Sequence, residues 1–120
     1  MTGKAVRLRD YMAKGRRRQR SEGMNTTERK YAEHLELQKS VGLISWWAYQ
    51  PLKFKLRLAD KTYYTPDFMV LRSDELLEIH EVKGFMEDDA AVKLKVAAET
   101  FPFPFKLVRW KGKQWEVREV

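Results

Sequence analysis

Hydrophobic and polar residues alternate in two neighbouring stretches near the middle of the chain, residues 67–71 and 76–83. In the second stretch, one set of alternate positions is Leu77, Ile79, Glu81 and Lys83, and the other is Leu76, Glu78, His80 and Val82. Side chains alternate between the two faces of a β-strand, so this pattern predicts two strands that pair as a hairpin. Such a hairpin brings Asp67, at the start of the first strand, close to Glu81 near the end of the second.

Helices are predicted on both sides of this hairpin. The first spans about 26–40, because Asn25 and Glu28 have the spacing of a capping box and Gly42 follows its expected end. The inward stripe of this helix consists of Tyr31, Ala32 and Leu35, with Glu28 on the same stripe. The second helix, about 87–100, begins with acidic residues and has one face rich in alanine.

Further strands are predicted at 44–50, 52–58, 62–64, 105–110 and 114–120, the last two forming a hairpin. Some of the short stretches between the helices can belong to one strand, so we expect the order helix, three or four strands, helix, two strands. It predicts an α+β, α/β sandwich-like domain with a mixed central sheet. In the stretch 52–58, basic residues occupy one side, which is either a solvated sheet face or a surface that contacts DNA.

Length and composition limit the number of domains and the expected location of the protein. The chain has 120 residues and 43% hydrophobic residues, which is enough for one compact domain. It has no cysteine, which excludes disulfides and thiolate metal sites and fits a reducing cytoplasm. No apolar run approaches the roughly 20 residues of a membrane span, and no apolar stretch follows the basic N-terminus. We therefore expect a cytoplasmic location, with no membrane association and no secretory signal.

The positive charge is concentrated at the N-terminus. Residues 1–20 contain one acid, Asp10, and eight basic residues: Lys4, Arg7, Arg9, Lys14, Arg16, Arg17, Arg18 and Arg20. The difference, +7, equals the net charge of the whole chain. We predict that residues 1–25 form a basic arm that contacts the phosphate backbone of DNA, and a solvated tail without a specific partner is the alternative.

The predicted hairpin also suggests a chemistry. Asp67 and Glu81 at one end of a sheet could bind Mg²⁺, a hard ion that takes oxygen ligands and keeps several waters. A bound ion can acidify and orient a water for attack on a phosphodiester, and Lys83 can stabilise charge on the phosphate. The alternatives are a turn at Asp67 after Pro66, a surface pair of Glu81 with Lys83, and, for Glu28, a capping role alone.

The combination of Pro66-Asp67-Phe68 with Glu81-Val82-Lys83-Gly84 resembles the PD-(D/E)xK nuclease superfamily. The likeness extends over roughly 26–107 and is greatest to small phage endonuclease I-like and archaeal-type Holliday junction resolvases. It implies a restriction-endonuclease-like core. It also implies that Asp67, Glu81 and the Val82 carbonyl are metal ligands and that Lys83 is the catalytic lysine. In the resolvase branch a further glutamate comes from the preceding helix, and that position falls to Glu28.

The resemblance therefore implies a Mg²⁺-dependent endodeoxyribonuclease in residues 26–120, with Mn²⁺ as a substitute ion. We expect branched DNA as the substrate, a homodimer, and the cytoplasm of a bacterial host as the location. Lys93 on the second helix is a further candidate for a phosphate contact. Two alternatives stay open: a non-catalytic DNA-binding module with a degenerate nuclease fold, and a nicking or restriction-like nuclease on unbranched DNA.

Overall fold

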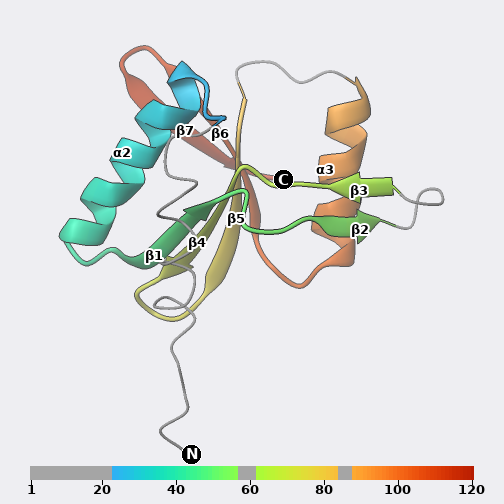
Figure 1. The fold of residues 1–120 in the computed structure, drawn as a ribbon, viewed down its shortest axis with the longest axis horizontal. Helices are drawn as coiled ribbons and strands as arrows, with labels where there is room; N and C mark the ends of the chain where they lie inside the picture. The colour runs from blue at the N-terminus through green and yellow to red at the C-terminus, as the bar shows by residue number, and fades with distance from the viewer. Residues whose placement is uncertain (1–22, 57–61, 84–87) are drawn as a thin grey trace, which may run out of the picture.

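The computed structural model describes residues 23–56, 62–83 and 88–120, so the charged residues of the predicted arm lie outside the described part. Its elements, shown in Figure 1, are α2 (Thr26–Ser40), β1 (Ile44–Tyr49), β2 (Phe54–Leu56), β3 (Thr62–Tyr64), β4 (Phe68–Arg72), β5 (Leu77–Val82), α3 (Asp88–Thr100), β6 (Phe105–Lys111) and β7 (Gln114–Glu119). These bounds follow the predicted elements closely, although five described strands, and not three or four, lie between the two helices. The second strand is shorter than predicted, and residues 57–58 of the predicted stretch lie outside the described residues.

The central sheet has five strands in the order β1-β4-β5-β6-β7. β5 and β6 are parallel, and the other neighbours are antiparallel. The prediction of an α+β fold with a mixed sheet is therefore confirmed. β2 and β3 form a separate two-stranded ribbon that lies over α3. The chain leaves the central sheet at Gln50, which has a φ of 44° and precedes Pro51, so β1 cannot continue into β2.

Each face of the sheet carries its own hydrophobic core. On one face α2 packs through its predicted stripe, which the structure buries together with Glu28. That core includes Leu35, Trp47, Phe68, Val70 and Val108. On the other face α3 and the ribbon pack against Trp46, Met69, Ile79 and Phe105. Neighbouring residues such as Met69 and Val70 enter different cores because alternate side chains of a strand point to opposite faces.

The hairpin of β4 and β5 has the register Phe68↔His80 to Leu71↔Leu77, as the alternation predicted. Because β5 is central, both of its faces are buried, including the polar residues Glu78 and His80. The Tyr31 hydroxyl is hydrogen-bonded to Nδ1 of His80 at 2.6 Å, and Nε2 of His80 lies 2.9 Å from Oε1 of Glu78. His80 is thus part of a satisfied buried network under α2, which agrees with a structural role.

Truncation of Leu35 should show how strongly α2 depends on its inward stripe. Leu35 is fully buried, so Leu35→Ala should lower the free energy of unfolding by about 2–5 kcal/mol through reduced packing and a cavity. The control is Leu37→Ala on the same helix, where the side chain is 62% exposed and the change should stay within about 0.5 kcal/mol. Urea unfolding followed by circular dichroism measures both, and equal losses of stability would contradict the assigned orientation of α2.

Candidate active site

Asp67 and Glu81 meet where the β4–β5 ladder ends. The last backbone pair is Phe68↔His80, so Asp67 stands opposite Glu81 one step further along. The Asp67 amide donates to Oε1 of Glu81 at 3.2 Å. The Val82 amide, beyond the end of the ladder, donates to Oδ2 of Asp67 at 2.9 Å. The Asp67 side chain thereby takes the acceptor role that a longer β4 would have supplied, and both carboxylates are almost fully buried.

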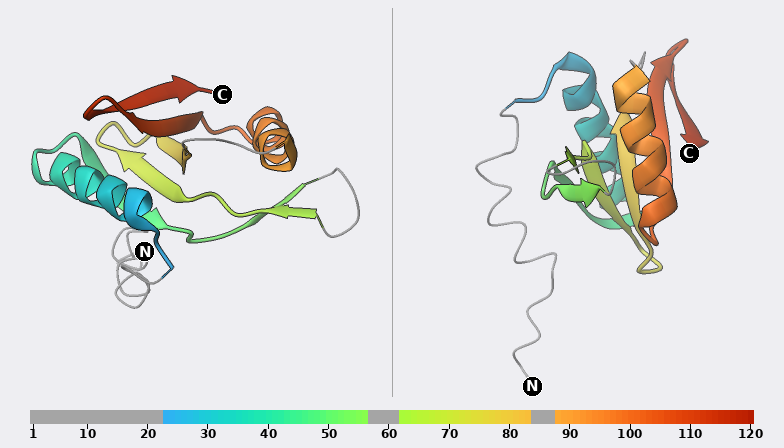
Figure 2. Two further views of the ribbon diagram at one scale, coloured as in Figure 1. Left: turned by 90° about the horizontal axis from the view of Figure 1, so that it is seen from above. Right: turned by 90° about the vertical axis from the view of Figure 1, so that its right-hand side faces the viewer.

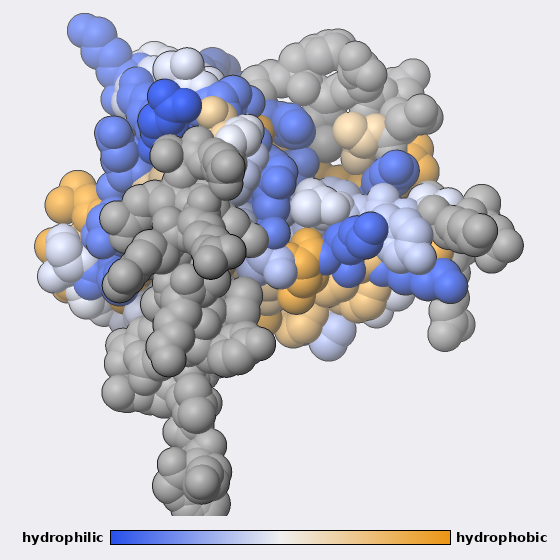
Figure 3. Space-filling view, viewed as in Figure 1, coloured by the Kyte–Doolittle hydropathy of each residue, from blue (hydrophilic) through white to orange (hydrophobic). Residues whose placement is uncertain are grey.

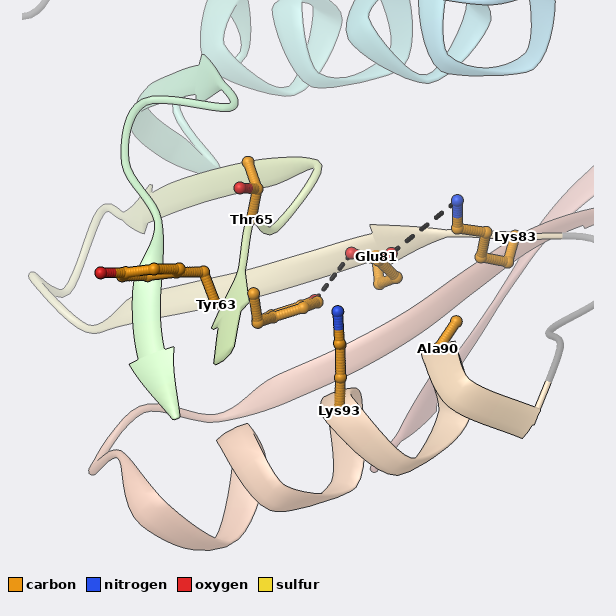
Figure 4. Close-up of a pocket in the computed structure, with 7 residues that line it drawn as sticks. Tyr63, Thr65, Glu81, Lys83, Ala90 and Lys93 are labelled. Atoms are coloured by element: carbon orange, nitrogen blue, oxygen red, sulfur yellow. Dashed lines mark hydrogen bonds and ion pairs between the residues drawn. The ribbon is translucent and has the colours of Figure 1, made fainter. Parts of the chain in front are cut away.

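Glu81 has two further neighbours with different functions. The Tyr64 hydroxyl, from β3, donates to Oε1 of Glu81 at 2.7 Å. The Lys83 ammonium lies 4.0 Å from Oε2 of the same carboxylate and is partly exposed. Figure 4 shows the ammonium group of Lys83 on one side of the Glu81 carboxylate. The tyrosine therefore holds one oxygen of Glu81 by a hydrogen bond, while the other oxygen has only the long ion pair with Lys83.

Glu28 combines the two roles that the sequence left open. It closes the capping box of α2, because the Asn25 amide donates to Oε1 of Glu28 at 2.9 Å and the Glu28 amide donates back to Asn25 at 2.8 Å. The Tyr49 hydroxyl donates to the same Oε1 at 3.1 Å. Glu28 is only 5% exposed, and its charge raises the pKa of both Asp67 and Glu81. A capping residue thus also belongs electrostatically to the carboxylate pair.

The three carboxylates share a pattern of hydrogen bonding. In each, the protein holds one oxygen: Oε1 of Glu28, Oδ2 of Asp67 and Oε1 of Glu81. Among the residues that the structure describes, the other oxygen of each carboxylate accepts no hydrogen bond. Among the described residues, the fully buried side-chain polar atom without a hydrogen bond is Nε1 of Trp46, so these three carboxylate oxygens reach solvent. They are the donor atoms that a hard cation entering from solvent would use.

The electrostatics of the cluster are unfavourable without a cation. The pKa of Asp67 rises from 3.8 to about 8, mainly because the carboxyl is buried and next because Glu81 carries a like charge. The Val82 amide and Lys83 oppose this rise without cancelling it. Burial also raises the pKa of Glu81, against the hydrogen bonds from Tyr64 and the Asp67 amide. At neutral pH the pair of carboxyls therefore retains a proton.

A pocket of about 320 Å³ opens beside Glu81. Its lining comes from β3, the end of β5 and α3: Tyr63, Tyr64, Thr65, Glu81, Lys83, Ala90 and Lys93. In Figure 4 the side chain of Lys93 extends from α3 towards Glu81, so two ammonium groups border the pocket. Lys93, singled out from the sequence for a phosphate contact, thus lies next to the carboxylates. The space-filling view in Figure 3 shows hydrophilic residues over the ribbon that forms one wall.

The donor set suits a divalent cation held mainly by water. Within the described ranges, no three acidic or histidine side chains are grouped closely enough to hold one ion together. Mg²⁺ usually requires only one or two carboxylates and keeps several waters, so Asp67 and Glu81 with the Val82 carbonyl are sufficient. The basic residues at 4–20 lie outside the described residues, so their predicted contact with DNA stays a prediction.

Two tyrosines belong to the site and were not predicted from the sequence. Tyr49 lies on a strand expected only to pack, and Tyr64 lies on a short strand before the motif. Both hydroxyl groups donate to carboxylates, and the pKa of each rises because of burial and the neighbouring negative charge. The signal in the sequence was weak, because a tyrosine in a strand is ordinary core composition and its hydroxyl partner depends on tertiary contacts.

Comparison of the chain with protein-family models, with curated proteins and with solved structures found no match. The resemblance to PD-(D/E)xK nucleases therefore depends on the motif residues and their geometry. In the part of the chain that the structure covers, no helix has both the length and the apolar character needed to cross a membrane.

Replacing Asp67 with asparagine should stabilise the metal-free protein, and more at high pH. The pKa of Asp67 is higher in the folded chain than in the unfolded chain, so the folded state keeps a proton that the unfolded state releases between about pH 4 and about pH 8. The wild-type free energy of unfolding therefore falls as the pH rises through this range. Asp67→Asn retains an acceptor for the Val82 amide and avoids this loss of stability, which should reach a few kcal/mol.

Urea unfolding in a chelator at several pH values measures this effect. The same substitution at exposed Asp74, which pairs with Arg72 at the surface, is the matched control and should change stability by less than about 1 kcal/mol. Parallel pH profiles for the wild type and Asp67→Asn would show that the carboxylate pair carries no electrostatic strain.

Proposed function

We propose that this protein is a metal-dependent endodeoxyribonuclease of the PD-(D/E)xK type, built on a restriction-endonuclease-like core. The observation that carries the proposal is the buried pair of Asp67 and Glu81, each with one oxygen held by the protein and one free. A structural pair of buried carboxylates would be costly, because like charges in a low-dielectric site destabilise each other. Such strain is common at functional sites.

Asp67, Glu81 and the Val82 carbonyl would hold Mg²⁺ or Mn²⁺, with Glu28 acting directly or through a water. When bound, the ion acidifies a water and orients it towards the phosphodiester. The Val82 amide and the Tyr64 hydroxyl keep the two carboxylates oriented, since each fixes one oxygen. Lys83 is 4.0 Å from Glu81 and partly exposed, so its ammonium can reach a phosphate oxygen and stabilise negative charge that develops during cleavage.

The pocket beside Glu81 supports a phosphate-containing substrate. Lys83 and Lys93 border it, and an ammonium is an effective point-charge partner for phosphate. The basic arm would add sequence-independent contacts to neighbouring phosphates. The resemblance favours branched DNA of the Holliday junction kind as the substrate. Resolution of such a junction requires two strands to be cut, so we propose that the enzyme acts as a homodimer, in the cytoplasm.

Removal of the charged groups should abolish cleavage while the fold is retained. Asp67→Asn, Glu81→Gln and Lys83→Ala should each lower the cleavage rate by about 10²-fold or more, because each removes a group that the reaction needs. The assay uses linear, flapped and four-way junction DNA of matched sequence with Mg²⁺, Mn²⁺ or Ca²⁺, and with chelator.

Glu99→Gln and Lys95→Ala on the exposed side of α3 are the matched controls and should cut at the wild-type rate. Cleavage should require Mg²⁺ or Mn²⁺, while Ca²⁺ should allow DNA binding with little cutting. Full activity in excess chelator would exclude the proposed metal chemistry. A wild-type rate in any one variant would remove that residue from the mechanism.

The capping and catalytic roles of Glu28 can be separated. Glu28→Gln retains an acceptor for the Asn25 amide and the Tyr49 hydroxyl but removes the charge, so it should lower cleavage by about tenfold or more with little change in stability. Asn25→Ala removes the side-chain cap and should lower the free energy of unfolding by about 0.5–2 kcal/mol while cleavage is retained. If Glu28→Gln and Asn25→Ala both lower the stability and both cleave DNA at the wild-type rate, then Glu28 only caps α2 and has no part in cleavage.

Deletion of residues 1–20 should weaken binding to every DNA substrate and leave cleavage at saturating DNA unchanged. Removing one phosphate-binding side chain reduces the slope of log affinity against log salt by about 0.9 on duplex DNA, and we expect a total reduction of roughly two to four. Fluorescence anisotropy across a salt series measures the slope. If the truncated protein keeps the slope, Lys53 and Lys55 on the exposed side of the β2 segment become the better candidates for the DNA surface.

A further inference from the structure

β7 is an exposed edge strand. It lies at one end of the strand order, and in the described part of the chain no strand pairs with its outer side. Both views in Figure 2 show it at the outside of the fold. All but one of its residues are exposed, and Val117 is 50% exposed. An edge of this length offers a row of unpaired backbone groups to another strand.

The register with β6 decides which backbone groups point outwards. The Val120 amide donates to the Phe105 carbonyl at 3.0 Å, so Val120 faces β6. In an antiparallel ladder the direction alternates along the strand, so Glu116 and Arg118 also face β6. The outward N–H and C=O groups therefore belong to Trp115, Val117 and Glu119.

We propose that β7 pairs antiparallel with β7 of a second copy of this chain, with Val117 opposite the partner's Val117. Hydrogen bonds form only in registers that place outward residues opposite outward residues. A register centred on Glu116 would oppose two glutamates, and one centred on Arg118 would oppose two arginines. The register centred on Val117 instead places Glu116 opposite the partner's Arg118, and the two-fold symmetry repeats this pair. Opposite charges directly across a ladder are stabilising and like charges are destabilising.

The existing ion pairs favour the same arrangement. Glu116 already accepts from Arg109 at 2.8 Å across the β6–β7 hairpin. Within the described residues Arg118 takes part in no ion pair, so it is available to approach the other side of the partner's Glu116. Charges on an edge strand can also serve to prevent pairing. A sequence that is charge-complementary to itself about Val117 does not provide that protection.

The pairing would place the two carboxylate sites in a defined relation, a consequence that rests on the proposed nuclease function. A two-fold axis perpendicular to the joined sheets puts both sites on the same face. The path from β5 to the partner's β5 crosses five strand spacings, which is roughly 24 Å. Across the sheet, Glu81 lies level with Leu107 and therefore with Arg118. Because Arg118 lies opposite the partner's Glu116, the two sites are offset by only two residues, about 7 Å along the strands. On that shared face the two sites run in opposite directions along the strands, which suits two DNA strands of opposite polarity.

Charge reversal at the two paired positions tests this interface. Glu116→Arg and Arg118→Glu, studied separately, should each weaken dimerisation by about tenfold or more, because both attractive pairs become repulsive. An equimolar mixture of the two variants should dimerise like the wild type, since each pair is then attractive again. Analytical ultracentrifugation over a concentration series measures the association. Glu99→Arg on exposed α3 is the control and should leave it unchanged.

Val117→Pro gives an independent test through the backbone. Proline lacks the outward N–H of Val117, and that group makes no hydrogen bond to β6, so the fold should survive while the dimer dissociates. Circular dichroism checks the fold of each variant. A monomeric wild type, a mixture that stays monomeric, or a folded Val117→Pro dimer would each overturn the proposed interface. Ultracentrifugation measures the mass of the particle and does not depend on DNA cleavage. An active monomer would therefore refute the interface alone, and an inactive dimer would refute the nuclease function alone.

Discussion

Burial of two neighbouring carboxyl groups at the end of one hairpin is the constraint on which the rest of the site depends. Asp67 and Glu81 are each about 4–5% exposed, and burial together with their mutual repulsion keeps a proton on the pair at neutral pH. The fold tolerates the pair because the Val82 amide holds one oxygen of Asp67, and the Tyr64 hydroxyl and the Asp67 amide hold one oxygen of Glu81. The other two oxygens are the donors that the proposed cation would use. In this account, therefore, the structure stores electrostatic strain that metal binding would relieve.

The surrounding elements serve this arrangement in distinct ways. The ribbon of β2 and β3 leaves the central sheet after Gln50 and returns Tyr64 to Glu81. The N-terminus of α2 presents Glu28, which Tyr49 holds against the same region. On the opposite face of β5, Glu78 is hydrogen-bonded to His80 and paired with Lys106, and these contacts lower its pKa to about 2. The two acidic residues of β5 thus differ in their partners. Both oxygens of Glu78 have close partners, whereas only Oε1 of Glu81 accepts hydrogen bonds.

Much of this could be predicted from local sequence. Alternation predicted the β4–β5 hairpin and with it the contact of Asp67 with Glu81, because register in a short hairpin follows from the strands themselves. The stripe on α2 predicted the inward direction of Glu28. Tyr49 and Tyr64 could not be predicted, since their hydroxyl partners lie 21 and 17 residues away in sequence. The separate ribbon was also missed, because strand patterns show where strands form and do not show which sheet they join.

Binding of Mn²⁺ to the metal-free protein is the most direct test of a cation site at Asp67 and Glu81. Thermal unfolding is measured with and without Mn²⁺ near pH 8, for the wild type and for the double variant Asp67→Asn/Glu81→Gln. An ion that binds only the folded state raises the midpoint of unfolding. We expect Mn²⁺ to raise the midpoint of the wild type by several degrees and to leave that of the double variant unchanged. The same shift in both proteins, or no shift in the wild type, would contradict a cation site at Asp67 and Glu81.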